Sequence, residues 1–165
     1  MITRRFLLLG GAASILALAT ERWVASPLEA APAKQFPLMR SNAEWQALLS
    51  PEQYDVLRNE GTERPFTSPL LSEKRRGNYA CAACELDLFS SATKYDSGTG
   101  WPSFWAALEP ALGSEEDRSW GMTRTSVFCS RCGGHQGHVF DDGPAPTGLR
   151  YCINGVALTF KAAVG

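Results

Sequence analysis

Two pairs of cysteines, each with the spacing Cys-x-x-Cys, constrain the fold of this chain more than any other feature of its sequence. Residues 85–128 separate the two pairs. A two-residue spacer allows both thiolates of a pair to bind one tetrahedral ion, so two pairs offer four sulfur ligands. Four sulfurs leave no open coordination position, and the sequence therefore predicts one structural zinc ion that clips two distant turns into a single domain. The predicted ligands are Cys81, Cys84, Cys129 and Cys132.

Disulfide bonds are the alternative for these four cysteines, because disulfides are common in exported proteins. Disulfides within the pairs would be redox motifs, whereas disulfides between the pairs would form a scaffold. Neither arrangement accounts for two matched pairs as simply as one metal ion does, so zinc is the interpretation that we favour. A clip of this kind closes a long loop, which in theory lowers the entropy of the unfolded chain.

The rest of the sequence favours short strands and turns over long helices, since five tryptophans and eight phenylalanines accompany 15 glycines and ten prolines. Two short helices are expected first. Ser41 and Glu44 form a capping box for one helix, and Ser50 caps the other, which should end at Gly61. We therefore predict a mostly β domain, largely antiparallel, on which the two N-terminal helices pack. The β segments are expected at 78–80, 103–108, 118–121, 123–128, 138–140, 149–153 and 156–160.

Residues 1–33 have the organisation of an export signal. Arg4 and Arg5 precede an uncharged apolar run over 6–19, and an A-x-A-type cleavage site closes the segment. The apolar run is shorter than the roughly 20 residues of a membrane-spanning helix, so we expect no stable membrane insertion of the mature chain. The two arginines favour the twin-arginine route over the general secretory route. Residues 34–165 are then expected to be a periplasmic domain.

The fifth cysteine, Cys152, lies outside the two pairs, and an unpaired thiol in an exported chain requires an explanation. In a strand, Arg150 and Asn154 would share a face with Cys152, where the guanidinium would favour a thiolate and the amide would bind a polar ligand. His135 and His138, the only histidines, precede it in a glycine-rich stretch. From these residues alone, a nucleophilic cysteine and an inert buried cysteine are equally open.

Three runs of residues resemble the B-type methionine sulfoxide reductases: GWPSF at 100–104, CGGHQGHVF at 132–140 and GLRYCIN at 148–154. Both Cys-x-x-Cys pairs also match the zinc site of that family. The resemblance extends over residues 41–162, in order and without large gaps. It implies a β fold of two antiparallel sheets, and reduction of the R epimer of methionine sulfoxide, chiefly within oxidised proteins.

The resemblance also implies roles for individual residues. A thiolate can attack the polarised sulfur of a sulfoxide while a histidine supplies the proton that the departing oxygen needs. Methionine then leaves, and the cysteine becomes a sulfenic acid. An indole wall beside a small methyl pocket would select one epimer by shape, and this is the role implied for Trp101. The implied catalytic residues are Cys152, His135, His138 and Asn154, and the implied substrate-binding residues are Trp101, Phe104 and Arg150.

Two positions depart from that family. Many of its members carry a resolving cysteine immediately before the Gly-Trp-Pro-Ser-Phe run, where this chain has Thr99. Because the other four cysteines are assigned to zinc, the sulfenic acid of Cys152 would have no partner within the chain. An external thioredoxin-like thiol is therefore expected as the reductant. Gly155 also stands where a serine is common, a difference that should matter less.

The expected partners are oxidised proteins and this thiol reductant, acting on a monomer. The formal net charge of −1 provides no basic field that would attract nucleic acid. Two other functions are open on the sequence alone: a non-catalytic zinc module that binds a modified side chain, and a thiol peroxidase that consumes peroxide. Alkylation of Cys152 separates the first from a reductase, because a binding module has no need of a thiol.

Overall fold

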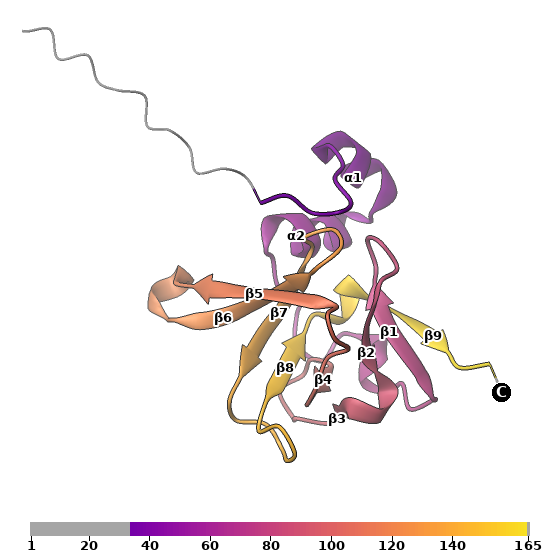
Figure 1. The fold of residues 1–165 in the computed structure, drawn as a ribbon, viewed down its shortest axis with the longest axis vertical. Helices are drawn as coiled ribbons and strands as arrows, with labels where there is room; N and C mark the ends of the chain where they lie inside the picture. Colours follow the sequence, from indigo (N-terminus) through magenta and orange to yellow (C-terminus); the bar gives the residue numbers. More distant parts are fainter. Residues whose placement is uncertain (1–33, 165) are drawn as a thin grey trace, which may run out of the picture. The chain divides into compact units, whose positions relative to one another are not determined.

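The computed structural model describes residues 34–164, so the expected export signal at 1–33 lies outside the described part. The strands are β1 (Gly77–Cys81), β2 (Asp87–Ser90), β3 (Lys94–Tyr95), β4 (Ser103–Phe104), β5 (Leu112–Asp117), β6 (Arg124–Cys129), β7 (His135–Phe140), β8 (Arg150–Ile153) and β9 (Leu158–Ala162). One sheet has the order β2-β1-β9, and the other has the order β3-β4-β8-β7-β6-β5 (Figure 1). All neighbouring strands are antiparallel. The prediction of a mostly β fold with two antiparallel sheets is confirmed.

Two short helices precede the strands, as predicted. In α1 (Asn42–Leu48), the Ser41 hydroxyl accepts the N–H of Glu44, and the Glu44 carboxylate accepts the N–H of Ser41. Ser50 caps α2 (Pro51–Asn59) with a second capping box. These caps satisfy N–H groups that the first helical turn cannot bond internally. Both helices lie at one end of the sheets (Figure 1), and neither they nor any other helix within 34–164 is long and apolar enough to cross a membrane.

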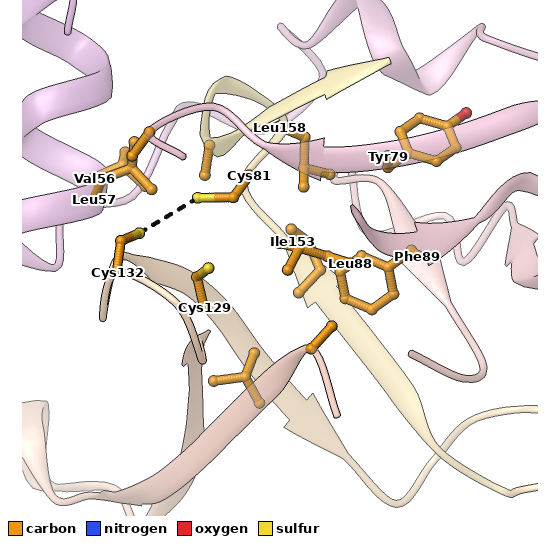
Figure 2. Close-up of a cluster of buried hydrophobic side chains, with 14 of the residues drawn as sticks. Val56, Leu57, Tyr79, Cys81, Leu88, Phe89, Cys129, Cys132, Ile153 and Leu158 are labelled. Carbon is orange, nitrogen blue, oxygen red and sulfur yellow. Dashed lines mark hydrogen bonds between the residues drawn. The ribbon is translucent and has the colours of Figure 1, made fainter. Parts of the chain in front are cut away.

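Aromatic side chains join the two sheets. Tyr79 of β1 and Phe89 of β2 are fully buried and pack against Phe104 of β4. The rings of Phe89 and Phe104 stack with centroids 4.3 Å apart, and Tyr79 meets Phe104 edge-on at 5.0 Å. Such pairs stabilise a core by about 0.5–1.5 kcal/mol beyond the burial of their area. The core continues to Ile153 of β8, which belongs to the same buried cluster (Figure 2).

The structure corrects several strand predictions. The segment 118–121 is a turn, because Ser119–Gly121 forms a 3-10 turn in which Trp120 has a φ of 58°, a value outside the strand region. The segment 103–108 is a strand only at Ser103–Phe104. The sequence pattern does not predict β2, β3 or β5; β5 reads LGSEED, and these residues are poor strand formers. The remaining predicted strands coincide with β1, β6, β7, β8 and β9 within a few residues.

The middle of the six-stranded sheet brings together residues that are far apart in the sequence. Cys152 in β8 lies opposite His138 in β7 and opposite Ser103 in β4. Directly opposite residues of antiparallel strands have Cβ atoms about 4.5–5.5 Å apart. Gly137 permits the close approach of β7 to β8, because a Cβ atom there would lie 2.1 Å from the carbonyl oxygen of Cys152. The register therefore places a thiol beside an imidazole on one face of the sheet.

Candidate metal centre and active site

The four paired cysteines converge on one point. Cys81 ends β1 and Cys129 ends β6, while Cys84 and Cys132 lie in the turns that follow these strands. All four sulfur atoms lie within 4.8 Å of one another. The Cys81 and Cys132 sulfurs are 3.7 Å apart (Figure 2), and the Cys84 and Cys129 sulfurs are 3.4 Å apart. Tetrahedral zinc with Zn–S bonds of about 2.3 Å requires S–S separations of about 3.8 Å, so the four residues fit a four-sulfur metal site.

The sulfur geometry also distinguishes a metal site from the disulfide alternative. The shortest sulfur contacts, 3.4 and 3.7 Å, are much longer than an S–S bond of about 2.05 Å. All five cysteines belong to the described residues, and all five are free thiols. The cluster is therefore a site that can bind a metal ion, and it joins the end of β1 in one sheet to the end of β6 in the other.

Two side chains that the sequence analysis did not single out donate to the cluster. The guanidinium of Arg58 lies 3.7 Å from the Cys132 sulfur and donates to the Cys132 carbonyl at 3.1 Å. The amide of Gln136 lies 3.5 Å from the Cys81 sulfur. Donors of this kind stabilise thiolates and fix the orientation of metal ligands. Because Arg58 belongs to α2, the metal site also holds this helix against the sheet.

Cys152 lies apart from this cluster, in the wall of a small pocket on the six-stranded sheet. The pocket has a volume of about 140 Å³, which suits the end of one side chain. It contains four of the residues that the sequence implicates, together with four others. The lining residues are Trp101, His138, Cys152 and Asn154, with Thr62, Arg124, Gly137 and Phe140.

His138 is the pocket residue that can hold a proton for transfer. Its Nε2 atom lies 2.8 Å from Oδ2 of Asp117, the last residue of β5. Hydrogen bonds from the Ser119 backbone N–H and from His138, with Arg124, hold the pKa of Asp117 well below its usual value. The ionised carboxylate has no hydrogen to donate, so Nε2 carries the hydrogen of this contact. A second proton on the ring of His138 therefore resides on Nδ1.

His135 lies next to His138 but has a different character. Its side chain is only 5% exposed, and its ring centroid is 5.4 Å from that of His138. Burial, with a smaller contribution from His138, lowers the pKa of His135 to about 4. Its Nδ1 atom lies 3.1 Å from the Ser126 hydroxyl. The structure thus brings both histidines together, but only His138 lines the pocket, and His135 is neutral at pH 7.

Glu63, which the sequence analysis did not single out, ties two walls of the pocket together. Its backbone N–H donates to Oδ1 of Asn154 at 3.0 Å, and its carbonyl accepts from Nε1 of Trp101 at 3.1 Å. Its carboxylate accepts the N–H groups of the two residues that follow Asn154, at 2.5 and 2.9 Å. The amide nitrogen of Asn154 donates to the Gln136 carbonyl at 3.1 Å. Asn154 therefore bonds the protein through both ends of its amide group.

Burial dominates the electrostatics of Cys152 and raises the pKa of its thiol. The Thr99 hydroxyl, 3.8 Å from the sulfur, and the Arg150 guanidinium offset part of this effect. Arg150 also makes two hydrogen bonds of 2.8 Å to the Asp142 carboxylate and lies 4.3 Å over the Phe140 ring. Arg150 therefore lowers the pKa of Cys152, as expected. Burial raises this pKa by more, and the charge of Asp142 also raises it.

Phe104 is placed in the core rather than at the pocket. Successive side chains of a strand point to opposite faces. Because Ser103 lies opposite Cys152, Phe104 points away from the pocket, toward Tyr79 and Phe89. Its side chain is fully buried there. The GWPSF run therefore supplies Trp101 to the pocket and Phe104 to the contact between the sheets.

Comparison with known proteins identifies the domain. The family model described as the SelR domain matches residues 49–162. The chain belongs to the SelR family. The match begins just before the Ser50 cap of α2 and ends with β9, so the SelR domain includes both the four-cysteine cluster and the pocket of Cys152.

Several curated relatives of this SelR domain carry the name peptide methionine sulfoxide reductase MsrB. The Pseudomonas putida protein is 59% identical over 123 residues, which cover 74% of this chain and 92% of the relative. The Methanosarcina barkeri protein is 58% identical over 123 residues, covering 74% and 87%. The Leptospira interrogans protein is 51% identical over 127 residues, covering 76% and 97%.

Proposed function

We propose that this SelR-family protein reduces the R epimer of methionine sulfoxide to methionine, chiefly within oxidised proteins, and that Cys152 is the nucleophile. The observation that carries the proposal is the pocket in which Cys152 lies opposite His138 and beside Trp101. Its support is the likeness to relatives named peptide methionine sulfoxide reductase, at 51 to 59% identity. A thiol, a proton donor and an aromatic wall are the groups that this reaction needs.

The reaction transfers oxygen from the substrate to the cysteine. The Cys152 thiolate attacks the sulfoxide sulfur and forms an S–S bond with it. The sulfoxide S–O bond and this new S–S bond then break as the oxygen moves to the cysteine sulfur. One proton completes the sulfenic acid, and methionine leaves. The substrate sulfur gains two electrons, which the Cys152 sulfur loses, so no other oxidant or reductant takes part in this step.

His138 would supply the proton from Nδ1, while Asp117 holds Nε2. General acids of this kind contribute about 10²- to 10⁴-fold to the rate. His135 is neutral at pH 7, with a pKa of about 4, so its contribution would be to hold the His138 ring in place. His138 would therefore transfer the proton, and His135 would support the position of the His138 ring.

Trp101 would receive the methyl group of the substrate. Its indole Nε1 donates to the Glu63 carbonyl at 3.1 Å, and this bond fixes the plane of the ring. A fixed wall in a pocket of about 140 Å³ would hold the methyl group and the oxygen of a sulfoxide in one arrangement in which the sulfur faces Cys152. The R epimer would fit this arrangement, and the S epimer would exchange the methyl group and the oxygen.

We infer that the metal ion is one Zn²⁺ per chain, bound by Cys81, Cys84, Cys129 and Cys132. The sulfur separations of 3.4 and 3.7 Å and the all-thiolate donor set support this choice of ion. When bound, zinc would supply a structural link between the two sheets. The four sulfurs would fill its coordination, and the reaction at Cys152 would not involve it.

We also propose an external thioredoxin-like thiol as the reductant that regenerates Cys152. Four of the five cysteines belong to the metal cluster, and the residue that contacts the Cys152 sulfur from the neighbouring loop is Thr99 rather than a cysteine. We keep the proposals of a periplasmic monomer and of a twin-arginine export signal at 1–33. The motif Arg4-Arg5 and the apolar run that follows support the export signal and the periplasmic location.

The test is to incubate the protein with separate R and S epimers of a blocked methionine sulfoxide and dithiothreitol. The R epimer should be consumed and the S epimer should not. Cys152→Ser should abolish turnover while the melting temperature and the metal content stay unchanged. Equal rates on the two epimers, or an active serine variant, would remove the proposal.

A further inference from the structure

Three hydroxyl groups form a row that leads to the sulfur of Cys152. The Ser103 and Ser97 oxygens are 2.7 Å apart, the Ser97 and Thr99 oxygens are 2.8 Å apart, and the Thr99 oxygen is 3.8 Å from the sulfur. Ser103 is fully buried and lies opposite Cys152 in the register of β4 and β8. The row therefore connects Ser103 of β4 to Cys152 of the neighbouring strand β8. Its two middle members, Ser97 and Thr99, lie in the loop between β3 and β4.

The loop that carries Thr99 is held on both sides of this residue. The Gly98 N–H donates to the Asp96 carboxylate at 2.9 Å, which closes a turn. The Gly100 carbonyl accepts the N–H of Phe66 at 2.8 Å. Gly100 has a φ of 92°, a conformation that favours glycine. These bonds keep the hydroxyl of Thr99 at the sulfur of Cys152.

Counting hydrogens gives the direction of the row when Cys152 is a thiol. Ser103 donates its single hydroxyl hydrogen to the Trp101 carbonyl at 3.1 Å, so its oxygen must accept from Ser97. The Ser97 oxygen then accepts from Thr99, and the Thr99 oxygen accepts the S–H of Cys152. Each link of the row has one hydrogen, and every group in it is satisfied.

A thiolate at Cys152 has no hydrogen, and the same row can serve it by reversing. Thr99 then donates to the sulfur, Ser97 donates to Thr99, and Ser103 donates to Ser97. No bond breaks except the hydrogen bond from Ser103 to the Trp101 carbonyl, because the change is a rotation of three hydroxyl groups. Hydrogen bonds to a charged acceptor are stronger than neutral ones, and aligned donors reinforce one another.

We propose that Ser103, Ser97 and Thr99 form a reversible hydrogen-bond chain that lets the buried sulfur of Cys152 exist as a thiolate. Thr99 touches the reacting sulfur and is the catalytic member, while Ser97 and Ser103 are positioning residues that act through it. This inference rests on the proposed role of Cys152 as the nucleophile. It gives position 99 a chemical task in a chain that has no cysteine there.

Other groups also act on Cys152, and the test must hold them constant. Burial raises the pKa of the thiol, and the hydroxyl of Thr99 is the largest of the influences that lower it. Substitutions within the hydroxyl row leave the remaining groups in place. The titratable and charged groups that face the sulfur are Tyr95 of β3, Arg124 of β6, His138 of β7, Asp142 after β7 and Arg150 of β8.

The experiment compares Thr99→Val with Thr99→Ser in the metal-loaded protein. The rate of Cys152 alkylation by iodoacetamide is measured across neutral and alkaline pH, and mass mapping confirms which cysteine reacts. Valine keeps the shape of threonine without the hydroxyl, so the midpoint of the profile should rise by about one pH unit, with an about tenfold lower rate below it. The serine variant should overlay the wild type.

A third variant tests the chain beyond Thr99. Ser97→Ala should move the midpoint upward by less than Thr99→Val does, because Thr99 keeps its hydroxyl but loses its own donor. A wild-type profile for Thr99→Val, or equal shifts for the valine and serine variants, overturns the proposal. A wild-type profile for Ser97→Ala overturns the three-member chain.

Turnover gives an independent readout of the same chain. Thr99→Val should lower kcat at neutral pH with little change in KM, and alkaline pH should restore it. Thr99→Ser keeps the hydroxyl and should lose much less kcat than Thr99→Val does. Alkylation needs no sulfoxide, so the hydroxyl chain can fail while the reductase proposal stands. Conversely, the epimer assay can fail while the alkylation profiles agree with the chain.

Discussion

The four-cysteine cluster and Cys152 are both largely buried sulfur sites, but they deal with burial in different ways. In the cluster, four sulfurs face one another within 4.8 Å, and side chains of Arg58 and Gln136 donate to them. At Cys152, one sulfur lies in a pocket wall, where burial raises its pKa and a threonine hydroxyl contacts it. A cation can neutralise the first site, whereas the Thr99 hydroxyl and the Arg150 guanidinium, which is also paired with Asp142, assist the second.

Under the proposed function, this difference separates four metal-binding thiols from one reactive thiol. The cluster sulfurs come from the last residues of two strands, one in each sheet, and from the turns that follow them, so their arrangement depends on the whole fold. Cys152 depends on the register of neighbouring strands, and one side of it remains open to the pocket. Substitutions at the cluster should therefore damage stability first, and substitutions at the pocket should damage chemistry first.

The largest expected effect comes from Cys129→Ser. Metal binding free energy in such sites is about 10–16 kcal/mol and acts as folding free energy, while the net stability of a domain is about 5–15 kcal/mol. The variant should lose its metal and be largely unfolded at 25 °C. Far-UV circular dichroism and a metal assay measure this, with Cys152→Ser as the folded control. A folded, metal-free Cys129→Ser protein would show that the cluster does not support the fold.

The two histidines provide the next test, because they separate chemistry from support within the pocket. His138→Gln should lower the single-turnover rate constant by about 10²- to 10³-fold, since it removes the proton donor. His135→Asn should lower this rate constant less, because His135 is neutral and does not line the pocket. Both variants should retain metal. A larger loss for His135→Asn than for His138→Gln would contradict the assignment.

His135 should also make stability depend on pH. Its pKa falls from 6.5 to about 4 on folding, so between these values the unfolded chain binds a proton that the folded protein does not. The contribution of His135 to the free energy of unfolding should therefore be greatest above about pH 6.5. It should decrease by about 3 kcal/mol as the pH falls to about 4. Urea unfolding at several pH values measures this change.

The control for this pH dependence is His135→Asn, which removes the titrating group. Acid also weakens metal binding in both proteins, so the difference between their two curves isolates the contribution of His135. Between about pH 6.5 and 4, the wild type should lose about 3 kcal/mol of stability relative to His135→Asn. Parallel curves over the whole range would rule out a depressed pKa for His135.

The smallest expected effect concerns the helix that borders the cluster. Ser50→Ala removes the cap of α2, whose hydroxyl accepts the Gln53 N–H at 3.1 Å, and should cost about 1 kcal/mol of stability. Ser50→Asp should restore most of it. Alkylation of Cys152 should be unaffected, because α2 contacts the cluster side of the sheet through Arg58. A changed alkylation rate would mean that the two sulfur sites are coupled.

Features that lie close together in the sequence were predictable from it. The helix caps, the two cysteine pairs and the strand around Cys152 each depend on a few neighbouring residues, and the structure has all of them. Contacts between distant residues were not predictable. Asp117 meets His138 across 21 positions and Glu63 meets Asn154 across 91.

These distant contacts follow from the register of the strands, which the side-chain pattern alone does not determine. The pairing of β6 with β7 shifts between Val127 and Phe128, and this irregularity places Phe128 opposite His135 rather than opposite Gln136. β5, which carries Asp117, reads as an acidic loop in the sequence. The same limit applies to Phe104. The GWPSF motif can be recognised in the sequence, but the register of β4 decides that Ser103 lies opposite Cys152 and that Phe104 points into the core.

The pairing of β9 with β1 has a consequence for how the protein is made. Leu158, in the last strand, lies beside Cys81, the first of the four cluster cysteines. A nascent chain that has reached Asn154 already contains all five cysteines, yet it lacks the strand against which Cys81 is seated. We therefore expect the four thiols to capture a metal ion only after β9 has been synthesised and has paired with β1, and a chain truncated after Asn154 should leave the cluster cysteines open to thiol reagents.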